Sequence, residues 1–241
     1  AYNKLKTMTL DEKINQILLV RYPDANQKEI LKDKQFGGYV FFAKDFKDKT
    51  KEEVSDMMRQ LQEVSNIPIL TAVDEEGGDV VRVSSNRNLK VKSFSSPRNL
   101  YIEGGFELIR RDNEEKNELL KSLGLNINLA PVLDISTDKS DYIYYRSIGL
   151  SPELTGEFAK VIIESSKDSG IVNVMKHYPG YGKNKDTHKT SSLDTRSKEE
   201  VERDLGPFKR AILSGAEAIM ISHNTVEVLD SINPASISIN N

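Results

Sequence analysis

Short, almost uninterrupted apolar segments recur along this 241-residue chain, and they constrain the fold more than any other feature of the sequence. A strand with one solvent-exposed face alternates apolar and polar residues. These segments do not alternate, which is typical of strands buried on both faces of a parallel sheet. Because helical patterns separate them, the sequence predicts an α/β fold. The expected strands lie at residues 39–42, 69–73, 127–133, 171–175 and 218–221.

Helix starts lie between the apolar segments, and several carry a capping box, in which Ser or Thr is followed three residues later by Glu. Capping boxes begin at Thr9, Thr50 and Ser197. Ser151 precedes a proline, a residue favoured at the first helical position. Apolar residues at helical spacing follow each of these starts, so we expect one helix after each of them.

Polar residues follow four of the expected strands at the point where each strand ends. In a TIM barrel, the active site is built on one face from the carboxyl ends of many different strands. A doubly wound nucleotide-binding sheet would instead need a glycine-rich turn after its first strand, but Gly37-Gly38 precede that strand and lack the G-x-G-x-x-G spacing. The sequence therefore predicts a (β/α)8 TIM-barrel-like fold. The polar residues are Asp74, Asp134, Lys176, His177, Ser222 and His223.

Composition and charge exclude several classes of partner. The formal net charge is -3 and the pI is about 5.8, so no basic surface predicts a nucleic acid partner. Cysteine is absent, which removes disulfides and cysteine metal sites, and no apolar run approaches the roughly 20 residues of a transmembrane segment. No linker or repeat interrupts residues 1–241, so we expect a single domain. The sequence determines neither compartment nor oligomeric state.

Two of the three histidines lie in one segment. Lys176 and His177 end an apolar strand, and a loop with the Asp-x-His pair Asp186 and His188 follows. In an extended Asp-x-His the two side chains project to the same side, so the carboxylate can orient and charge the imidazole. His177, His188, His223 and Asp186 could together also hold a metal ion. Metal-ligand spacing is absent, however, and Lys176 would repel a cation, so a metal site is disfavoured.

Other candidate residues also have a plain structural interpretation. The Asp74-Glu75-Glu76 segment is either a solvated acidic turn or part of a site. Arg82 favours a site, because its guanidinium can pair with a carboxylate or bind substrate oxygens. Arg146 stands beside tyrosines, as many surface arginines do, and His223 alone is typical of a hydrogen-bonded histidine at a strand end.

Taken together, these segments resemble glycoside hydrolase family 3, and in particular its bacterial β-N-acetylglucosaminidases. The resemblance runs from about residue 9 to residue 238. Its most specific part is the Lys-His-x-Pro-Gly block at residues 176–180 with the Asp-x-His pair at residues 186–188. The other matching segments are residues 37–42, 71–82, 128–134, 146–149 and 221–223.

The resemblance implies a (β/α)8 barrel that removes terminal N-acetylglucosamine from β-linked glycans or muropeptides, with retention through a covalent glycosyl-enzyme. It implies that Asp186 and His188 form the family's acid/base dyad, in which the imidazole protonates the departing oxygen and later deprotonates the attacking water. An ordinary histidine, with a pKa of about 6.5, suits both steps near neutral pH. No metal or organic cofactor is implied. The residues that the resemblance places in the terminal-sugar pocket are Asp74, Arg82, Arg146, Lys176, His177 and His223.

The chain also departs from the family pattern. Glu75 stands where a glutamine is common, and Tyr178 and Tyr181 replace a phenylalanine and a histidine. The family's nucleophile is an aspartate in a Ser/Thr-Asp-Asp segment, which does not occur before Asn241. About five strand units are recognisable, so we expect the last units of the barrel to be missing and two sheet edges to be exposed. The alternative functions are a sugar-binding remnant without a nucleophile and a family 3 β-glucosidase, which the Asp-x-His pair disfavours.

Overall fold

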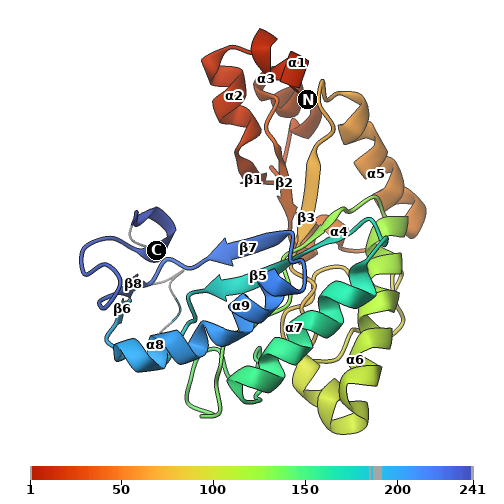
Figure 1. The fold of residues 1–241 in the computed structure, drawn as a ribbon. Helices are drawn as coiled ribbons and strands as arrows, with labels where there is room; N and C mark the ends of the chain where they lie inside the picture. Colours follow the sequence, from red (N-terminus) through yellow and green to blue (C-terminus); the bar gives the residue numbers. More distant parts are fainter. Residues whose placement is uncertain (1, 185, 187–191, 240–241) are drawn as a thin grey trace.

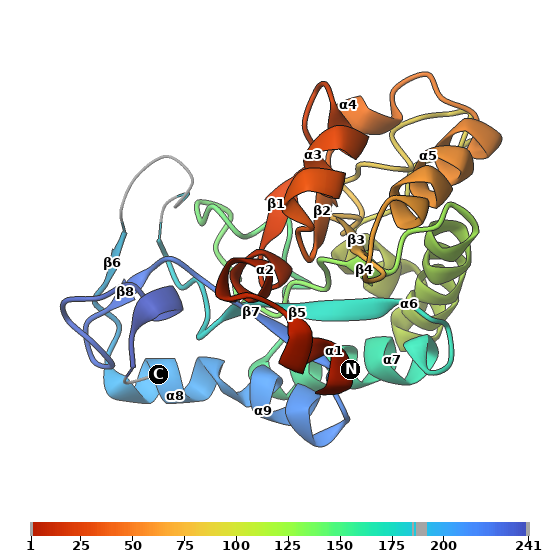
Figure 2. The same cartoon turned by 90° about the horizontal axis from the view of Figure 1, so that it is seen from above.

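A computed structural model describes residues 2–184, 186 and 192–239, and its centre is a six-stranded parallel sheet (Figure 1). The strands lie side by side in the order of the chain, and each is parallel to the next. The sheet curls, with helices along its outer face (Figure 2), which confirms the predicted incomplete TIM-barrel-like α/β fold. The strands are β1 (Leu19–Arg21), β2 (Gly38–Phe41), β3 (Leu70–Val73), β4 (Ile127–Asn128), β5 (Val172–Tyr178) and β7 (Ala218–Ile221).

The predicted helix starts are confirmed. Thr9, Thr50 and Ser197 each accept a hydrogen bond from the N–H of the glutamate three residues on, whose side chain bonds back to the cap. Ser151 caps its helix through the N–H of Leu154. Within the described residues, none of the helices has both the length and the apolar character to cross a membrane. The helices are α1 (Tyr2–Thr7), α2 (Leu10–Gln16), α3 (Gln27–Lys34), α4 (Ala43–Phe46), α5 (Lys51–Glu63), α6 (Pro97–Ser122), α7 (Pro152–Ser166), α8 (Lys198–Asp204), α9 (Gly206–Leu213) and the short 3₁₀ helix Ala235–Ile237.

Two helical segments differ from what the sequence predicts. The segment after Ser197 forms α8 and α9 rather than one helix, because Pro207 lacks the N–H that would extend the hydrogen-bond ladder of α8. The apolar residues of α2 are exposed rather than packed: Leu10 is 70% and Ile14 is 45% exposed. The capping box at Thr9 therefore marks the start of a helix that adds no buried side chain to the core.

The strands differ from the prediction in two places. The apolar run at residues 127–133 is regular only over β4, because Pro131 has no N–H to donate to a ladder. The N–H of Leu133 nevertheless donates to the carbonyl of Lys176 (N···O 2.6 Å), so the run still follows β5 and delivers Asp134 to the end of the sheet. β1 was not predicted, since three residues are too few to show a period.

The core lies mainly between the sheet and the helices that cover its outer face. One cluster, with Phe41 and Met58, joins the first strands to α5. Another, with Phe158, Met175 and Phe208, joins β5 to α7 and α9. A third group of apolar side chains, from β2, β3, β4, β5 and β7, forms a separate cluster. The strands therefore bury side chains on both faces, which explains their nearly continuous apolar sequences.

A second, two-stranded sheet lies beyond the carboxyl end of β5. It pairs β6 (Leu193–Asp194) with β8 (Thr225–Val226) in parallel. Arg196 anchors it: its Nη1 lies 2.6 Å from the Asp204 carboxylate, its Nε lies 2.9 Å from the Asp194 carboxylate, and its Nη2 donates to the carbonyl of Gly180 (2.8 Å). The chain that leaves β5 is thereby held against the chain that enters α8.

Candidate active site

A pocket of about 470 Å³ lies at the carboxyl ends of the parallel strands, where TIM barrels bind their ligands. Its volume is typical of small-molecule sites. Side chains from the ends of β5 and β7 and from the segments that follow β2, β3 and β4 line it. The structure therefore brings together six of the predicted site residues, which lie far apart in the sequence. These are Asp74, Arg82, Arg146, Lys176, His177 and His223.

The end of β5 contributes two adjacent residues to the pocket, although neighbours in a regular strand face opposite ways. The pairing of β5 with β7 shifts between Lys176 and Tyr178, which leaves His177 as an extra residue. Such a bulge can re-aim a side chain, and bulges are frequent beside active sites. Lys176 and His177 consequently both line the pocket, and the peptide bond that joins them is cis.

Lys176 is the central cation of the pocket. Its side chain is only 2% exposed, and its Nζ lies 2.7 Å from the Asp74 carboxylate and 2.6 Å from the Glu76 carboxylate. A buried ammonium is costly unless it is paired, and here two carboxylates from the segment after β3 pair with it. The three consecutive carboxylates at residues 74–76 are thus not a solvated turn: Glu75 and Glu76 are buried, and Asp74 is 21% exposed.

Glu76 joins Lys176 to Arg146. The guanidinium of Arg146 binds the carboxylate of Glu76 in bidentate fashion, with Nε and Nη2 at 3.0 and 2.7 Å from the two oxygens. Burial alone would raise the pKa of Glu76, but the charges and hydrogen bonds of Lys176 and Arg146 outweigh burial and lower it to about 2. Burial likewise opposes the charge of Arg146, yet its hydrogen bonds to Glu76 raise the pKa of the guanidinium. Both groups are charged at neutral pH.

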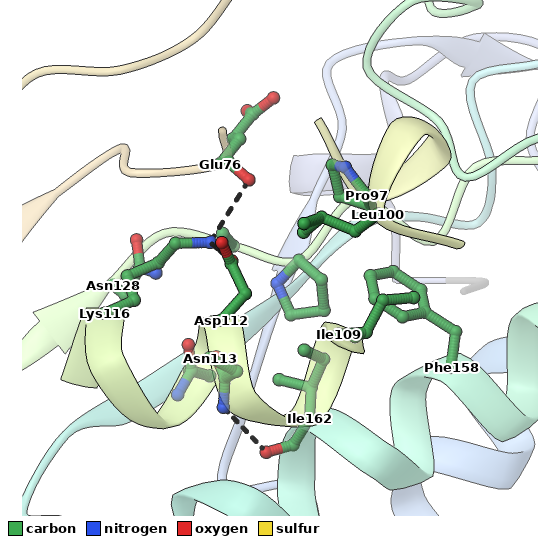
Figure 3. A pocket seen from close by; sticks show the side chains of 13 residues that line it. Glu76, Pro97, Leu100, Ile109, Asp112, Asn113, Lys116, Asn128, Phe158 and Ile162 are labelled. Atoms are coloured by element: carbon green, nitrogen blue, oxygen red, sulfur yellow. Dashed lines mark hydrogen bonds and ion pairs between the residues drawn. The ribbon is translucent and has the colours of Figure 1, made fainter. Parts of the chain in front are cut away.

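The main chain of Glu76 is held from behind by α6 (Figure 3). The Nζ of Lys116 lies 3.4 Å from the carbonyl oxygen of Glu76 and 3.1 Å from the carboxylate of Asp112, and both side chains are mostly buried. Nearby, the amide of Asn113 donates to the carbonyl of Ile162 on α7 (3.3 Å). These contacts tie the segment after β3 to two of the covering helices.

Glu75 positions Arg82. The fully buried carboxylate of Glu75 accepts the backbone N–H groups of Arg82 and Val83 (2.8 and 2.7 Å) and hydrogen-bonds to the N–H and hydroxyl of Ser84. This fixes the turn that carries Arg82 at the rim of the pocket. The Nε of Arg82 is buried and has no hydrogen-bond partner in the described part of the chain. Because Arg82 also lines the pocket, its guanidinium is a candidate to bind a ligand oxygen.

Asp134 supports the His177 side of the pocket. Its buried carboxylate lies 2.7 Å from Nδ1 of His177 and accepts the N–H of Tyr181 at 2.6 Å. The ring of Tyr181 contacts the His177 ring edge-on, with the centroids 5.4 Å apart, and packs on Tyr142 at 5.5 Å. Nη1 of Arg146 reaches the hydroxyl of Tyr142 (3.3 Å), which closes this side.

The predicted acid/base pair is described only in part. Asp186 is described and half-buried, and its charge is one of the causes that raise the pKa of Tyr142, after burial and alongside the opposing charge of Arg146. The charge of Asp186 thus acts on Tyr142, which lines the pocket, but Asp186 itself is not among the lining residues. His188 lies outside the described residues. His223 is exposed at the rim, with its Nδ1 2.8 Å from the hydroxyl of Ser236.

Several residues of the site were not predicted as such. Glu76 belongs to the acidic segment at residues 74–76, but it was not singled out from the sequence. The predicted cations Lys176 and Arg146 were a signal for it, because buried cations need a buried anion. Asp134 was noticed only as a polar residue after a strand. Tyr142 and Tyr181 gave no signal, since tyrosines are common both in cores and at surfaces.

The pocket combines polar groups with an apolar wall. Two carboxylates and three cations line it, and apolar side chains from the strand ends complete it, including Phe42, Leu129 and Met220. Fixed donors and acceptors around apolar surface suit a ligand with several hydroxyls and C–H faces, such as a sugar ring. Within residues 2–184, 186 and 192–239, no three His, Asp or Glu side chains are grouped as metal ligands.

These features define a pocket at the carboxyl ends of a curled, incomplete parallel α/β barrel, with charged residues that can bind and orient a polyhydroxylated molecule. The sequence matches the family described as "Glycosyl hydrolase family 3 N terminal domain" over residues 9–240. The chain therefore belongs to glycosyl hydrolase family 3.

Individual relatives agree with this assignment. The chain is 31% identical over 228 residues to a β-hexosaminidase of Tolumonas auensis, covering 89% of this chain and 64% of the relative. It is 29% identical over 206 residues to a β-hexosaminidase of Nitrosomonas eutropha, covering 84% of this chain and 58% of the relative. The chain thus spans less than two thirds of the length of either relative.

Solved structures show the same architecture. A glycoside hydrolase family 3 β-N-acetylglucosaminidase from Paenibacillus matches 97% of this chain and 46% of its own, with a TM-score of 0.88 and 27% identity. A family 3 glycosyl hydrolase from Mycobacterium smegmatis matches 98% of this chain and 71% of its own, with a TM-score of 0.85 and 25% identity.

Proposed function

We propose that this chain is the N-terminal part of the catalytic barrel of a β-N-acetylhexosaminidase, and that residues 1–241 all belong to that single barrel domain. The enzyme would remove terminal β-linked N-acetylglucosamine. The observation that carries this proposal is the convergence of Asp74, Arg82, Lys176 and His177 in one pocket. Family membership and the names of the relatives support it.

In this proposal the pocket binds the terminal sugar. The carboxylate of Asp74 accepts hydrogen bonds from sugar hydroxyls, because it is the carboxylate of the pocket with the larger exposed fraction, 21% against 2% for Glu76. Arg82 and Lys176 donate to sugar oxygens, and Arg146 and Glu76 hold each other at the pocket wall. His223 at the rim contacts the ligand from the side of β7.

The proposed reaction proceeds with retention and uses Asp186 and His188 as the acid/base pair. His188 protonates the glycosidic oxygen as the bond to the anomeric carbon breaks, and it later takes the proton of the attacking water. The nucleophile is assigned to a residue outside these 241, because Asp74 and Glu76, the carboxylates lining the pocket within the described residues, are both paired with Lys176.

Turnover of a chromogenic β-N-acetylglucosaminide by the protein expressed from its complete gene tests the proposal. We expect hydrolysis with retention by NMR of the released sugar, and slower turnover of the matching β-glucoside. His188→Ala should lower kcat by about 10²- to 10⁴-fold with poor leaving groups and by less with nitrophenol, which needs no proton. Asp56→Ala, an exposed position on α5, is the control and should leave kcat unchanged. Faster glucoside turnover, or undiminished activity in His188→Ala, contradicts the proposal.

A role in cell-wall turnover is the finer part of the proposal. Lys183 is exposed in the segment that leads from β5 toward Asp186, where a cation suits the anionic peptide of a muropeptide. Comparing kcat/KM for a muropeptide and for a chitin disaccharide tests it. A preference for the muropeptide that Lys183→Gln removes would support this role, whereas equal rates in both proteins would count against it.

A further inference from the structure

Asp134 has a fully buried carboxylate beside the pocket, but it is not one of the residues that line the pocket. Its side chain is 0% exposed. One oxygen accepts the backbone N–H of Tyr181 (2.6 Å), and the other meets both the backbone N–H (3.2 Å) and Nδ1 (2.7 Å) of His177. A buried carboxylate is stable only when hydrogen bonds or cations compensate its lost hydration. Two of these contacts come from backbone N–H donors, and Nδ1 of His177 adds a third donor only if it carries a proton.

The other nitrogen of His177 faces a group that can only donate. Nη2 of Arg146 lies 3.3 Å from Nε2 of His177, and the same Nη2 is held at 2.7 Å from Glu76. A guanidinium has no acceptor, so Nε2 must accept in this contact. A neutral imidazole then carries its proton on Nδ1, where Asp134 accepts it. Asp134 and Arg146 therefore both favour the Nδ1–H tautomer of His177.

We propose that Asp134 is a positioning residue that fixes His177 as its Nδ1–H tautomer, so that Nε2 can only accept a hydrogen bond. In the structure Nε2 faces Arg146, and a ligand group that replaces Arg146 at this lone pair must be a donor, as a sugar hydroxyl is, whereas a group that can only accept is disfavoured. This consequence rests on the proposed function, whereas the tautomer itself does not.

The Asp134 carboxylate also positions the aromatic ring of Tyr181, which packs against His177. By holding the N–H of Tyr181, Asp134 places the Tyr181 ring edge-on against His177. His177 is thus held by a hydrogen bond at one ring nitrogen, by Arg146 at the other, and by an aromatic ring beside it. The bulge that puts His177 out of register with β7 leaves it without regular pairing, so these contacts determine its orientation.

Nitrogen NMR of the imidazoles tests the tautomer directly. The chain has three histidines, so in the ¹⁵N-labelled protein the His177 signals can be assigned by comparison with His223→Ala and His188→Ala. We expect Nδ1 of His177 to be protonated in the wild-type protein. A His177 with its proton on Nε2 would overturn the proposal, whatever the sugar-binding result, and this measurement needs no variant of Asp134.

Asp134→Ala then tests the role of the carboxylate. We expect the Nε2–H tautomer to become populated, and calorimetry with N-acetylglucosamine to show about tenfold weaker binding, the effect of losing about one hydrogen bond to the ligand. A folded Asp134→Ala protein whose His177 stays entirely Nδ1–H would show that Arg146 suffices and that Asp134 does not position the ring.

Asp204→Ala is the matched control, since Asp204 is also a buried carboxylate but pairs with Arg196 and Arg203 rather than with His177. It should lower stability and leave the His177 tautomer unchanged. A changed tautomer in this control would mean that general loosening, not Asp134, moves the proton. If wild-type protein shows the Nδ1–H tautomer but binds no N-acetylglucosamine, the proposed function fails and the tautomer assignment stands.

Discussion

Replacing Glu76 by glutamine keeps the shape of the side chain and removes the charge on which Lys176 and Arg146 converge. The amide offers one oxygen where the carboxylate offers two, and it carries no charge, so Lys176 and Arg146 lose the anion that they share and Nε of Arg146 can lose its acceptor. Breaking a buried ion pair by removing one partner typically costs about 3–5 kcal/mol. We therefore expect Glu76→Gln to be strongly destabilised at pH 7.

The pH dependence of this lost stability is a more specific test of the ion pairs of Glu76 than the size of the loss. The pKa of Glu76 is lowered from 4.5 to about 2 in the folded protein, a shift that corresponds to roughly 3 kcal/mol. Because the folded pKa is the lower one, the stabilisation is fully present above about pH 4.5 and is lost as the pH falls through about 2. Glutamine cannot titrate, so the difference between the two proteins must shrink as the pH falls.

Urea unfolding of both proteins between pH 7 and about pH 3.5 measures this difference. Over that range it should shrink by about 1.4 kcal/mol, since one pH unit below the unfolded pKa corresponds to that amount. Glu63→Gln, which removes an exposed partner of Arg59 on α5, is the control and should change stability by less than about 0.5 kcal/mol at any pH. A Glu76→Gln penalty that stays constant with pH would refute the ion-pair account.

Three further substitutions test other parts of the site. Arg82→Lys should weaken N-acetylglucosamine binding about tenfold by calorimetry and hardly change Tm, because the Arg82 Nε is without a hydrogen-bond partner among the described residues; a large fall in Tm would mean that Arg82 is structural. Glu75→Gln should lower both Tm and affinity, since an amide cannot accept all the donors that hold the Arg82 turn; unchanged affinity would separate Glu75 from Arg82. Lys176→Met should leave Asp74 and Glu76 without their shared cation and cost about 3–5 kcal/mol in urea unfolding; a loss below about 1 kcal/mol would contradict the pairing.

The fold was largely predictable because buried parallel strands leave a clear mark in a sequence. The apolar segments that form β2, β3, β5 and β7 contain few polar residues. The capping boxes at Thr9, Thr50 and Ser197 indicate where helices begin. The prediction of secondary structure failed where tertiary contacts or a single residue determine whether a strand or helix forms. Three residues are too short to show a pattern in β1, and Pro207 divides a segment whose apolar spacing reads as one helix.

The site was predictable only as a set of polar residues at strand ends. Lys176 and His177 could be placed there, because a strand that ends on charged residues exposes them at one edge of the sheet. The pairings could not be predicted, since Glu76 and Arg146 are 70 residues apart and meet only through the curl of the sheet. The hydrogen bond between Asp134 and His177 likewise joins residues 43 apart.

A crystal structure of the protein from its complete gene, grown with N-acetylglucosamine, tests the central claim most directly. The account predicts one sugar ring in the pocket at the carboxyl ends of the strands, with its oxygens within hydrogen-bond distance of Asp74, Arg82 and Lys176. A sugar bound at another surface, with this pocket closed by its own side chains, would contradict it.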